Sequence, residues 1–206
     1  MNNFLRREFL FLRRPLNLLS RLLLLAAAAL IVATVFLPLW RIRLVAPQYQ
    51  EGLELRIYAF QIVGGNHGQD LNEINNLNHY IGMKPIAQAD FVEMKLVPFA
   101  FGVFVLLSLR AAVIGRMVSA IDLIVLFVYF GAFSIGSFAY RLYVYGHTLD
   151  PHAPMTIAGF TPVVIGSQKI ANFIQSSLPQ SGAILLIVAG ALMLAAIWCS
   201  RKEEVA

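Results

Sequence analysis

Four long apolar stretches dominate the pattern of hydrophobic and polar positions along the chain. They cover about residues 22–40, 96–114, 121–143 and 181–200. Each is close to the roughly 20 residues that a helix needs to cross the hydrocarbon layer of a bilayer. The polar positions are concentrated in two long segments, about 41–94 and 146–180. The pattern predicts an all-α membrane protein with four transmembrane helices, built as a single membrane domain over residues 1–206.

The first long polar segment has periodic patterns of its own. Residues 53–63 are rich in Leu, Ile, Tyr, Phe and Val with partial alternation, and they end at a Gly-Gly pair. This predicts one strand or a hairpin. Asp70 and Glu73 then have the spacing of a capping box, and apolar residues recur at helical intervals after them. A short amphipathic helix is therefore predicted over about residues 71–83.

The second long polar segment divides into two parts. Its first half contains Pro151, Pro154 and Pro162, which predict an extended, irregular conformation. Its second half, residues 167–178, has apolar residues at helical spacing between Ser167 and Pro179. We predict a second short amphipathic helix there, with the serine as cap and the proline as stop.

The composition supports a lipid environment. Hydrophobic residues make up 59% of the chain and charged residues only 13%, whereas soluble domains carry roughly 25% charged residues. The formal net charge of +5 does not indicate a nucleic-acid partner, because the Lys and Arg residues flank the apolar stretches and do not form a basic face of their own. They are typical of topology signals.

The distribution of charge predicts the orientation in the membrane. The N-terminus, the segment 110–122 and the C-terminus together hold nine Lys or Arg residues and four acidic ones, whereas the two long loops, taken together with Lys95 and Arg141 close to their ends, hold seven of each. The positive-inside rule places the basic side in the cytoplasm. We therefore expect a multi-pass protein of the bacterial inner membrane, with cytoplasmic termini and two periplasmic loops.

The histidines and half of the methionines fall in the two predicted periplasmic loops: His67, His79, His147, His152, Met83, Met94 and Met155. His79 and Met83 are four residues apart, which would place them on one face of the predicted helix. His147, His152 and Met155 lie within nine residues of the proline-containing loop. This spacing makes the histidines and methionines candidates for a shared site.

Imidazole and thioether groups without a thiolate suit copper, because Met favours Cu(I) while His accepts either oxidation state. We predict a copper site made by His79 and Met83 with His147, completed by His152 or Met155. The alternative interpretation is structural: the histidines would hydrogen-bond loop backbone and the methionines would fill gaps in apolar packing.

Other chemistries find less support in the sequence. Neither His79 nor His147 lies inside a predicted span, and no Cys-x-x-Cys-His motif exists for covalent haem attachment. Motifs of serine hydrolases, zinc proteases and phosphate-binding loops are also absent from the sequence, so we do not expect an enzyme. The single cysteine, Cys199, can form no internal disulfide.

Three groups of short motifs in the two long polar segments are distinctive: Ala46-Pro47-Gln48-Tyr49 with Glu51-Gly52-Leu53, the run Asn75–Met83 (NNLNHYIGM), and Tyr145-Gly146-His147 with Leu149-Asp150-Pro151 and Ala153-Pro154. With its pattern of spans, the chain resembles a family of four-span bacterial membrane proteins whose genes often lie near those for nitrous oxide reductase and its copper-delivery proteins. The resemblance implies a helper in periplasmic copper chemistry. The chain departs from that family at Phe160, where a Met is expected, and near Pro162, where more prolines are expected.

Together, these observations predict a non-enzymatic membrane accessory protein that binds or relays copper, or helps to mature a copper enzyme of the nitrous oxide reductase type. Its expected partners are the lipid bilayer and a periplasmic copper chaperone or copper enzyme. Two alternatives stay open. One is a structural or docking subunit of a larger membrane complex without a cofactor, and the other is a redox subunit associated with haem or quinone.

Overall fold

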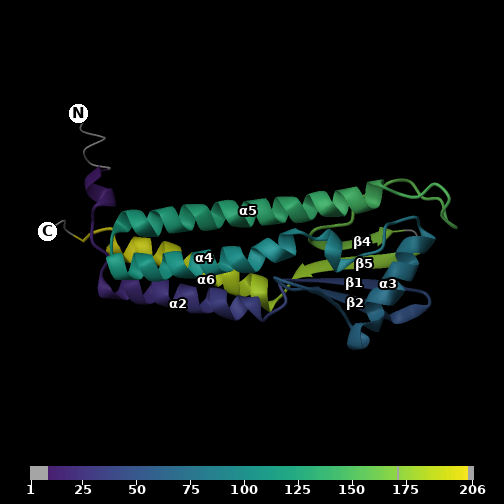
Figure 1. Ribbon diagram of the computed structural model, residues 1–206, viewed down its shortest axis with the longest axis horizontal. Coiled ribbons are helices and arrows are strands. Elements are labelled where there is room, and N and C mark those ends of the chain that lie inside the picture. The colour runs from purple at the N-terminus through teal and green to yellow at the C-terminus, as the bar shows by residue number, and fades with distance from the viewer. Residues whose placement is uncertain (1–8, 171, 204–206) are drawn as a thin grey trace. The chain divides into compact units, whose positions relative to one another are not determined.

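The computed structural model describes residues 9–170 and 172–203 (Figure 1). Within them it contains a five-stranded antiparallel sheet as well as helices. The prediction of an all-α fold is therefore wrong, and the protein is a mixed α and β structure. The error lies in the two long polar segments, which form most of the sheet, while the apolar stretches are helical as predicted.

Within the described residues, four helices are long and apolar enough to cross a membrane. They are α2 (Leu18–Val35), α4 (Glu93–Ile114), α5 (Met117–His147) and α6 (Ser181–Ser200). Helix α2 ends five residues before the predicted boundary, because Pro38 cannot continue a helix and Trp40 begins a strand. The 31 residues of α5 span about 46 Å at 1.5 Å per residue, which exceeds the roughly 30 Å of hydrocarbon.

The sheet joins the two polar segments. Its strands are β1 (Trp40–Ala46), β2 (Tyr49–Ile57), β3 (Ile62–Gly64), β4 (Gly166–Ile170) and β5 (Phe173–Pro179), in the spatial order β3-β2-β1-β5-β4. Strand β1 is central and pairs with β2 on one side and with β5 on the other. The strand or hairpin predicted over residues 53–63 corresponds to the end of β2 and to β3.

The amphipathic helix predicted over residues 167–178 is wrong, because the segment forms the β4–β5 hairpin. Ile170 and Phe173 are buried, whereas Ile174 and Leu178 are exposed, so the apolar stripe at helical spacing is divided between two faces of the sheet. Two polar residues on β5, Gln175 and Ser177, are buried and hide the period-two pattern of a strand.

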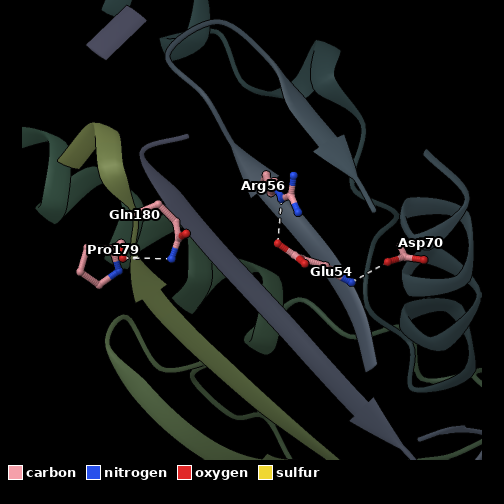
Figure 2. A network of polar contacts seen from close by, with 5 residues as sticks. All are labelled: Glu54, Arg56, Asp70, Pro179 and Gln180. Atoms are coloured by element: carbon pink, nitrogen blue, oxygen red, sulfur yellow. Dashed lines mark hydrogen bonds and ion pairs between the residues drawn. The ribbon is translucent and has the colours of Figure 1, made fainter. Parts of the chain in front are cut away.

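The other predicted amphipathic helix is confirmed as α3 (Gln69–Tyr80), which follows the short 3-10 helix η1 (Asn66–Gly68). The predicted capping box is wrong, since the N-cap is Gly68 and no side chain caps it. Instead, Asp70 accepts a hydrogen bond from the backbone N–H of Glu54 at 2.8 Å (Figure 2). Asp70 is buried and therefore anchors α3 to β2.

The core of this region lies between α3 and one face of the sheet. Alternate residues of the strands point to this inner face and pack against Ile74 and Ile81. The buried residues from the strands are Trp40, Ile42, Leu44, Ala46, Leu53, Leu55, Ile62, Ile170 and Phe173. Phe138 of α5 adds an edge-to-face contact with Trp40 at 5.4 Å between ring centroids.

The chain forms two compact units. One, which we call the sheet unit, comprises Phe36–Val97 and Phe133–Ala183 and includes the sheet, α3 and the 3-10 helix η2 (Gln88–Asp90). The other, the helical unit, comprises Met1–Val35, Pro98–Ala132 and Ile184–Ala206. In the helical unit, the Ser20 hydroxyl donates to the Ala196 carbonyl at 2.6 Å and lies 2.7 Å from the Ser200 hydroxyl, which ties α2 to α6.

Candidate metal-binding cluster

The end of α3 lies against the segment 148–157 of the second polar loop. The backbone N–H of Asp150 donates to the Gly82 carbonyl at 2.8 Å, and the N–H of Met155 donates to the Tyr80 carbonyl at 3.0 Å. Gly82 has φ +79°, and a Cβ there would lie 2.8 Å from the Asp150 carbonyl oxygen. A glycine is therefore required both by the backbone conformation and by the close approach of the two segments.

This arrangement forms a cavity of about 240 Å³ in the sheet unit. Its lining includes His147, Asp150 and Met155, together with Ile81 at the end of α3. Two of the residues predicted to bind copper, one imidazole and one thioether, thus share a cavity with a carboxylate. Asp150 was not among the predicted ligands, although its position between His147 and His152 in the sequence was a signal for it.

Asp150 also interacts with His152. The backbone N–H of His152 donates to Asp150 Oδ1 at 2.9 Å, and Nδ1 of the imidazole lies 3.4 Å from the same oxygen. The backbone hydrogen bond is the main cause of a lowered pKa for Asp150, and the imidazoles of His152 and His79 lower this pKa further. His79 therefore lies close enough to act on Asp150 electrostatically, and the carboxylate is held ionised at neutral pH.

The His147 ring is oriented by Tyr143. Its Nδ1 lies 3.0 Å from the Tyr143 carbonyl, and the two rings stack with their centroids 4.0 Å apart. A carbonyl oxygen can only accept, so Nδ1 carries the proton of the neutral imidazole. The lone pair on Nε2 is then free to bind a metal ion, as it is in many metal sites where the other ring nitrogen is hydrogen-bonded.

Met83 does not share a helix face with His79, so the predicted pairing of these two residues is wrong in its geometry. Helix α3 ends at Tyr80, and the left-handed conformation of Gly82 turns the chain before Met83. Met83 is half-buried against the sheet core, whereas His79 is exposed. Met155 is also half-buried against this core, although part of it lines the cavity.

Among residues 9–170 and 172–203, no three His, Cys, Asp or Glu side chains are grouped so that they could hold a metal ion. The donor groups around Asp150 are thus near one another without forming a closed coordination shell. His152 is very open, with 91% of its side chain exposed, and Asp150 is 63% exposed. His67 is in the 3-10 helix before α3 and does not line the cavity.

A scan of the chain against protein-family models found no match, and no curated protein matches it. The candidate site therefore has to be assessed on its own geometry.

Proposed function

We propose that this protein is a non-enzymatic accessory protein of the bacterial inner membrane that binds or relays copper at the periplasmic face. The observation that carries the proposal is the shared cavity of His147, Met155 and Asp150, next to the Asp150–His152 contact. Imidazole with thioether suits Cu(I), and imidazole with carboxylate suits Cu(II), so such a set could accept copper in either oxidation state.

An open donor set suits transfer better than storage. The cluster takes its donors from the last residue of α5, from the short loop after it and from the end of α3. The exposed His152 can reach a metal ion held by another protein. A periplasmic copper chaperone or a copper enzyme such as nitrous oxide reductase would supply the remaining ligands during exchange. The contribution of the chain is to engage Nδ1 of His147 with the Tyr143 carbonyl, which leaves Nε2 as the nitrogen that faces an ion, and to place a carboxylate beside it.

The proposed orientation has both termini in the cytoplasm and the sheet unit in the periplasm. It is supported by the surplus of Lys and Arg over acidic residues at the termini and in the segment 110–122, whereas the two long loops have no such surplus. In the periplasm the site would not compete with the abundant thiols of the cytosol.

The proposal is tested by metal analysis of the full-length protein purified in a mild detergent. After loading with Cu(I) and desalting, stoichiometric copper by mass spectrometry is expected for the wild type. The double variant His147→Ala/His152→Ala should lose this copper. The matched control His67→Asn should keep it, because Asn tolerates the positive φ of 57° at this position and His67 lies outside the cluster. Equal copper in the double variant and the wild type would refute the assignment.

A second candidate function is a docking subunit of a larger membrane complex without a cofactor. It is favoured by the packing of Met83 and Met155 against the sheet core, where thioethers act as ordinary apolar side chains. Wild-type protein that retains no copper, but co-purifies with stoichiometric membrane partners, would support this candidate. A Soret band in the visible spectrum would instead indicate a haem-associated redox subunit.

A further inference from the structure

The sheet has a second face, opposite α3, that carries a concentration of positive charge. Because side chains alternate along a strand, residues between the buried positions of β1, β2, β4 and β5 point to this face. We call it the outer sheet face, and its members include Arg41, Arg43, Glu54, Arg56, Lys169, Ile174 and Leu178. It therefore combines four basic residues and one acidic residue with exposed aliphatic side chains.

Arg41 and Arg56 are direct cross-strand partners in the β1–β2 pair. Like charges in this relationship destabilise a sheet, so some other interaction has to offset their repulsion. Glu54 does so only in part, by an ion pair with Arg56 (Figure 2) in which Oε1 lies 2.7 Å from Nε. One carboxylate among three arginines leaves the outer sheet face with an excess of positive charge.

The three arginines act on Glu54 together. Its pKa is lowered first by the hydrogen bond from Arg56, and then by the charges of Arg56, Arg41 and Arg43. Arg43 donates a hydrogen bond from Nη2 to the Glu51 carbonyl at 2.6 Å. Because this acceptor is neutral, it does not compensate the charge of Arg43. The excess positive charge of the outer sheet face therefore lies mainly on the arginines of β1 and β2.

The position of Arg41 in the chain relates this charge to a candidate membrane span. Its partner on β5 is Leu178, which precedes the first residue of α6, Ser181, by three residues. Three extended residues cover at most about 11 Å. The 20 residues of α6 are about as many as a crossing needs, so Ser181 has to lie near the boundary of the hydrocarbon layer. Leu178 and Arg41 then fall at the level of the lipid headgroups.

We propose that Arg41 and Arg56 bind the phosphate group of an anionic phospholipid in the leaflet where α6 begins. Guanidinium groups bind phosphate through paired N–H donors, and two adjacent arginines can do so from both sides. Leu178, which is 41% exposed, supplies apolar surface for the glycerol and upper acyl region. An acidic protein would also match the charge, but the closeness of Leu178 to the start of α6 favours a lipid. The proposal does not depend on copper binding.

The test measures thermal unfolding of the full-length protein in a neutral detergent by tryptophan fluorescence. Phosphatidylglycerol, phosphatidylcholine or inorganic phosphate is added at equal phosphate concentration. Phosphatidylglycerol is expected to raise the midpoint by about 2–4 °C more than phosphatidylcholine, as for about 1 kcal/mol in a chain of this size. Equal shifts with the two lipids would overturn the proposal, and would be expected if the face binds an acidic protein. An equal shift with inorganic phosphate would overturn the lipid assignment.

Two single-charge variants locate the effect. Arg41→Gln should lose the increment from phosphatidylglycerol and should have a higher midpoint than the wild type in detergent alone, because the repulsion from Arg56 is removed. The control Lys84→Gln removes the same charge from an exposed position outside the strands and should keep the full increment. A full increment in Arg41→Gln would overturn the proposal.

If Arg41→Gln does not fold, the conservative variant Arg41→Lys and native mass spectrometry provide the answer. The lysine keeps the charge but lacks the paired donors, so it should retain fewer phosphatidylglycerol molecules than the wild type at the same collision energy. Equal retention in the two proteins would count against the site.

Discussion

Two hydrogen bonds join the side chains of Arg141 and Glu93. Nε of the guanidinium donates to Oε1 of the carboxylate at 2.9 Å, and Nη2 donates to Oε2 at 3.0 Å. Glu93 is the first residue of α4 and Arg141 lies near the end of α5, so the pair connects two helices within the sheet unit. The ring of Phe91 lies 5.6 Å from the guanidinium carbon and covers one side of it.

This pair is expected to couple the stabilities of the two helices. In a double-mutant cycle with Glu93→Gln and Arg141→Met, we predict a coupling free energy of about 0.5–1 kcal/mol, since both side chains are about one third exposed and solvent screens the attraction. Thermal unfolding of the wild type, the two single variants and the double variant measures it. A cycle of Arg141→Met with Lys95→Met, which changes another charged residue of the first turns of α4, should be additive. Additivity in the Glu93 cycle would contradict the prediction.

A second prediction concerns the buried hydrogen bonds of Ser177. Its hydroxyl accepts from Nε1 of Trp40 at 2.8 Å and donates to the Val164 carbonyl at 2.7 Å, and the residue is fully buried. Ser177→Ala leaves the indole N–H and the carbonyl without their partner, which should lower the free energy of unfolding by about 1–3 kcal/mol.

The neighbouring Ser176 offers a matched control for this change. Its hydroxyl pairs with Ser167 at 2.8 Å on the outer sheet face, where water can replace the lost partner. Ser176→Ala should therefore cost less than about 0.5 kcal/mol. Denaturant unfolding in a mild detergent, followed by tryptophan fluorescence, compares the two. Equal effects would mean that the Trp40 interaction adds nothing to stability.

A third prediction tests the docking of the loop 148–157 on α3. Gly82→Ala puts a methyl group 2.8 Å from the Asp150 carbonyl oxygen, so the loop has to move away. We expect faster hydrogen exchange at the amides of Asp150 and Met155, which bond to this turn. Gly68→Ala is the control: its φ is also positive, at +94°, but no atom lies within 4 Å of the added Cβ.

Both variants bear the cost of a left-handed alanine, about 1–2 kcal/mol. Only Gly82→Ala also brings a methyl group too close to the Asp150 carbonyl. The amount by which hydrogen exchange is faster in Gly82→Ala than in Gly68→Ala therefore measures the contact between α3 and the loop. Unchanged exchange at Asp150 and Met155 in Gly82→Ala would show that the loop does not depend on this close approach.

A fourth prediction concerns acid. The pKa of Glu54 is lowered in the folded protein, chiefly by the hydrogen bond from Arg56. A carboxylate with a lowered pKa stabilises the folded state fully above its ordinary pKa of 4.5, and this contribution is lost as the pH falls through the folded value. The sheet unit should therefore lose stability below about pH 4.5. The part of this loss that comes from protonation of Glu54 should be absent in Glu54→Gln.

The comparison needs thermal midpoints of the wild type and Glu54→Gln between pH 7 and pH 3. Glu51→Gln, which changes an exposed residue near the start of β2, is the control and should keep the wild-type pH profile. If the Glu54→Gln profile is as steep as that of the wild type, the acid sensitivity arises from other carboxyl groups.

The candidate site could be predicted from the sequence only where its residues are close neighbours in the chain. His147, His152 and Met155 lie within nine residues: His147 is the last residue of α5, and His152 and Met155 lie on the loop that follows it, with Asp150 between them and His147. The proximity of His79 to this loop depends on the contact between Gly82 and Asp150, which no local pattern indicates. The predicted placement of His79 and Met83 on one helix face was wrong because the helix ends between them.

Patterns of neighbouring residues were enough to predict the four apolar helices and α3. Both predictions depend on properties that are summed over neighbouring residues: the length and hydropathy of an apolar stretch of about 20 residues, and the apolar stripe of one amphipathic helix. The starts and ends of α4 and α6 lie within three residues of the predicted spans. Neighbouring residues suffice for such predictions because a helix satisfies its backbone hydrogen bonds internally.

The sheet, in contrast, depends on contacts between segments that are distant in the chain. Strand β1 acquires its backbone partners from β2 nearby and from β5 more than 130 residues away, as in the pairing of Arg41 with Leu178. Ser177 can be buried in a strand because Trp40 and Val164 satisfy its hydroxyl, and this removed the alternation that would have predicted β5. The backbone hydrogen bonds and side-chain packing of a strand are supplied by adjacent strands, so the hydrophobic pattern of one segment does not by itself predict a strand.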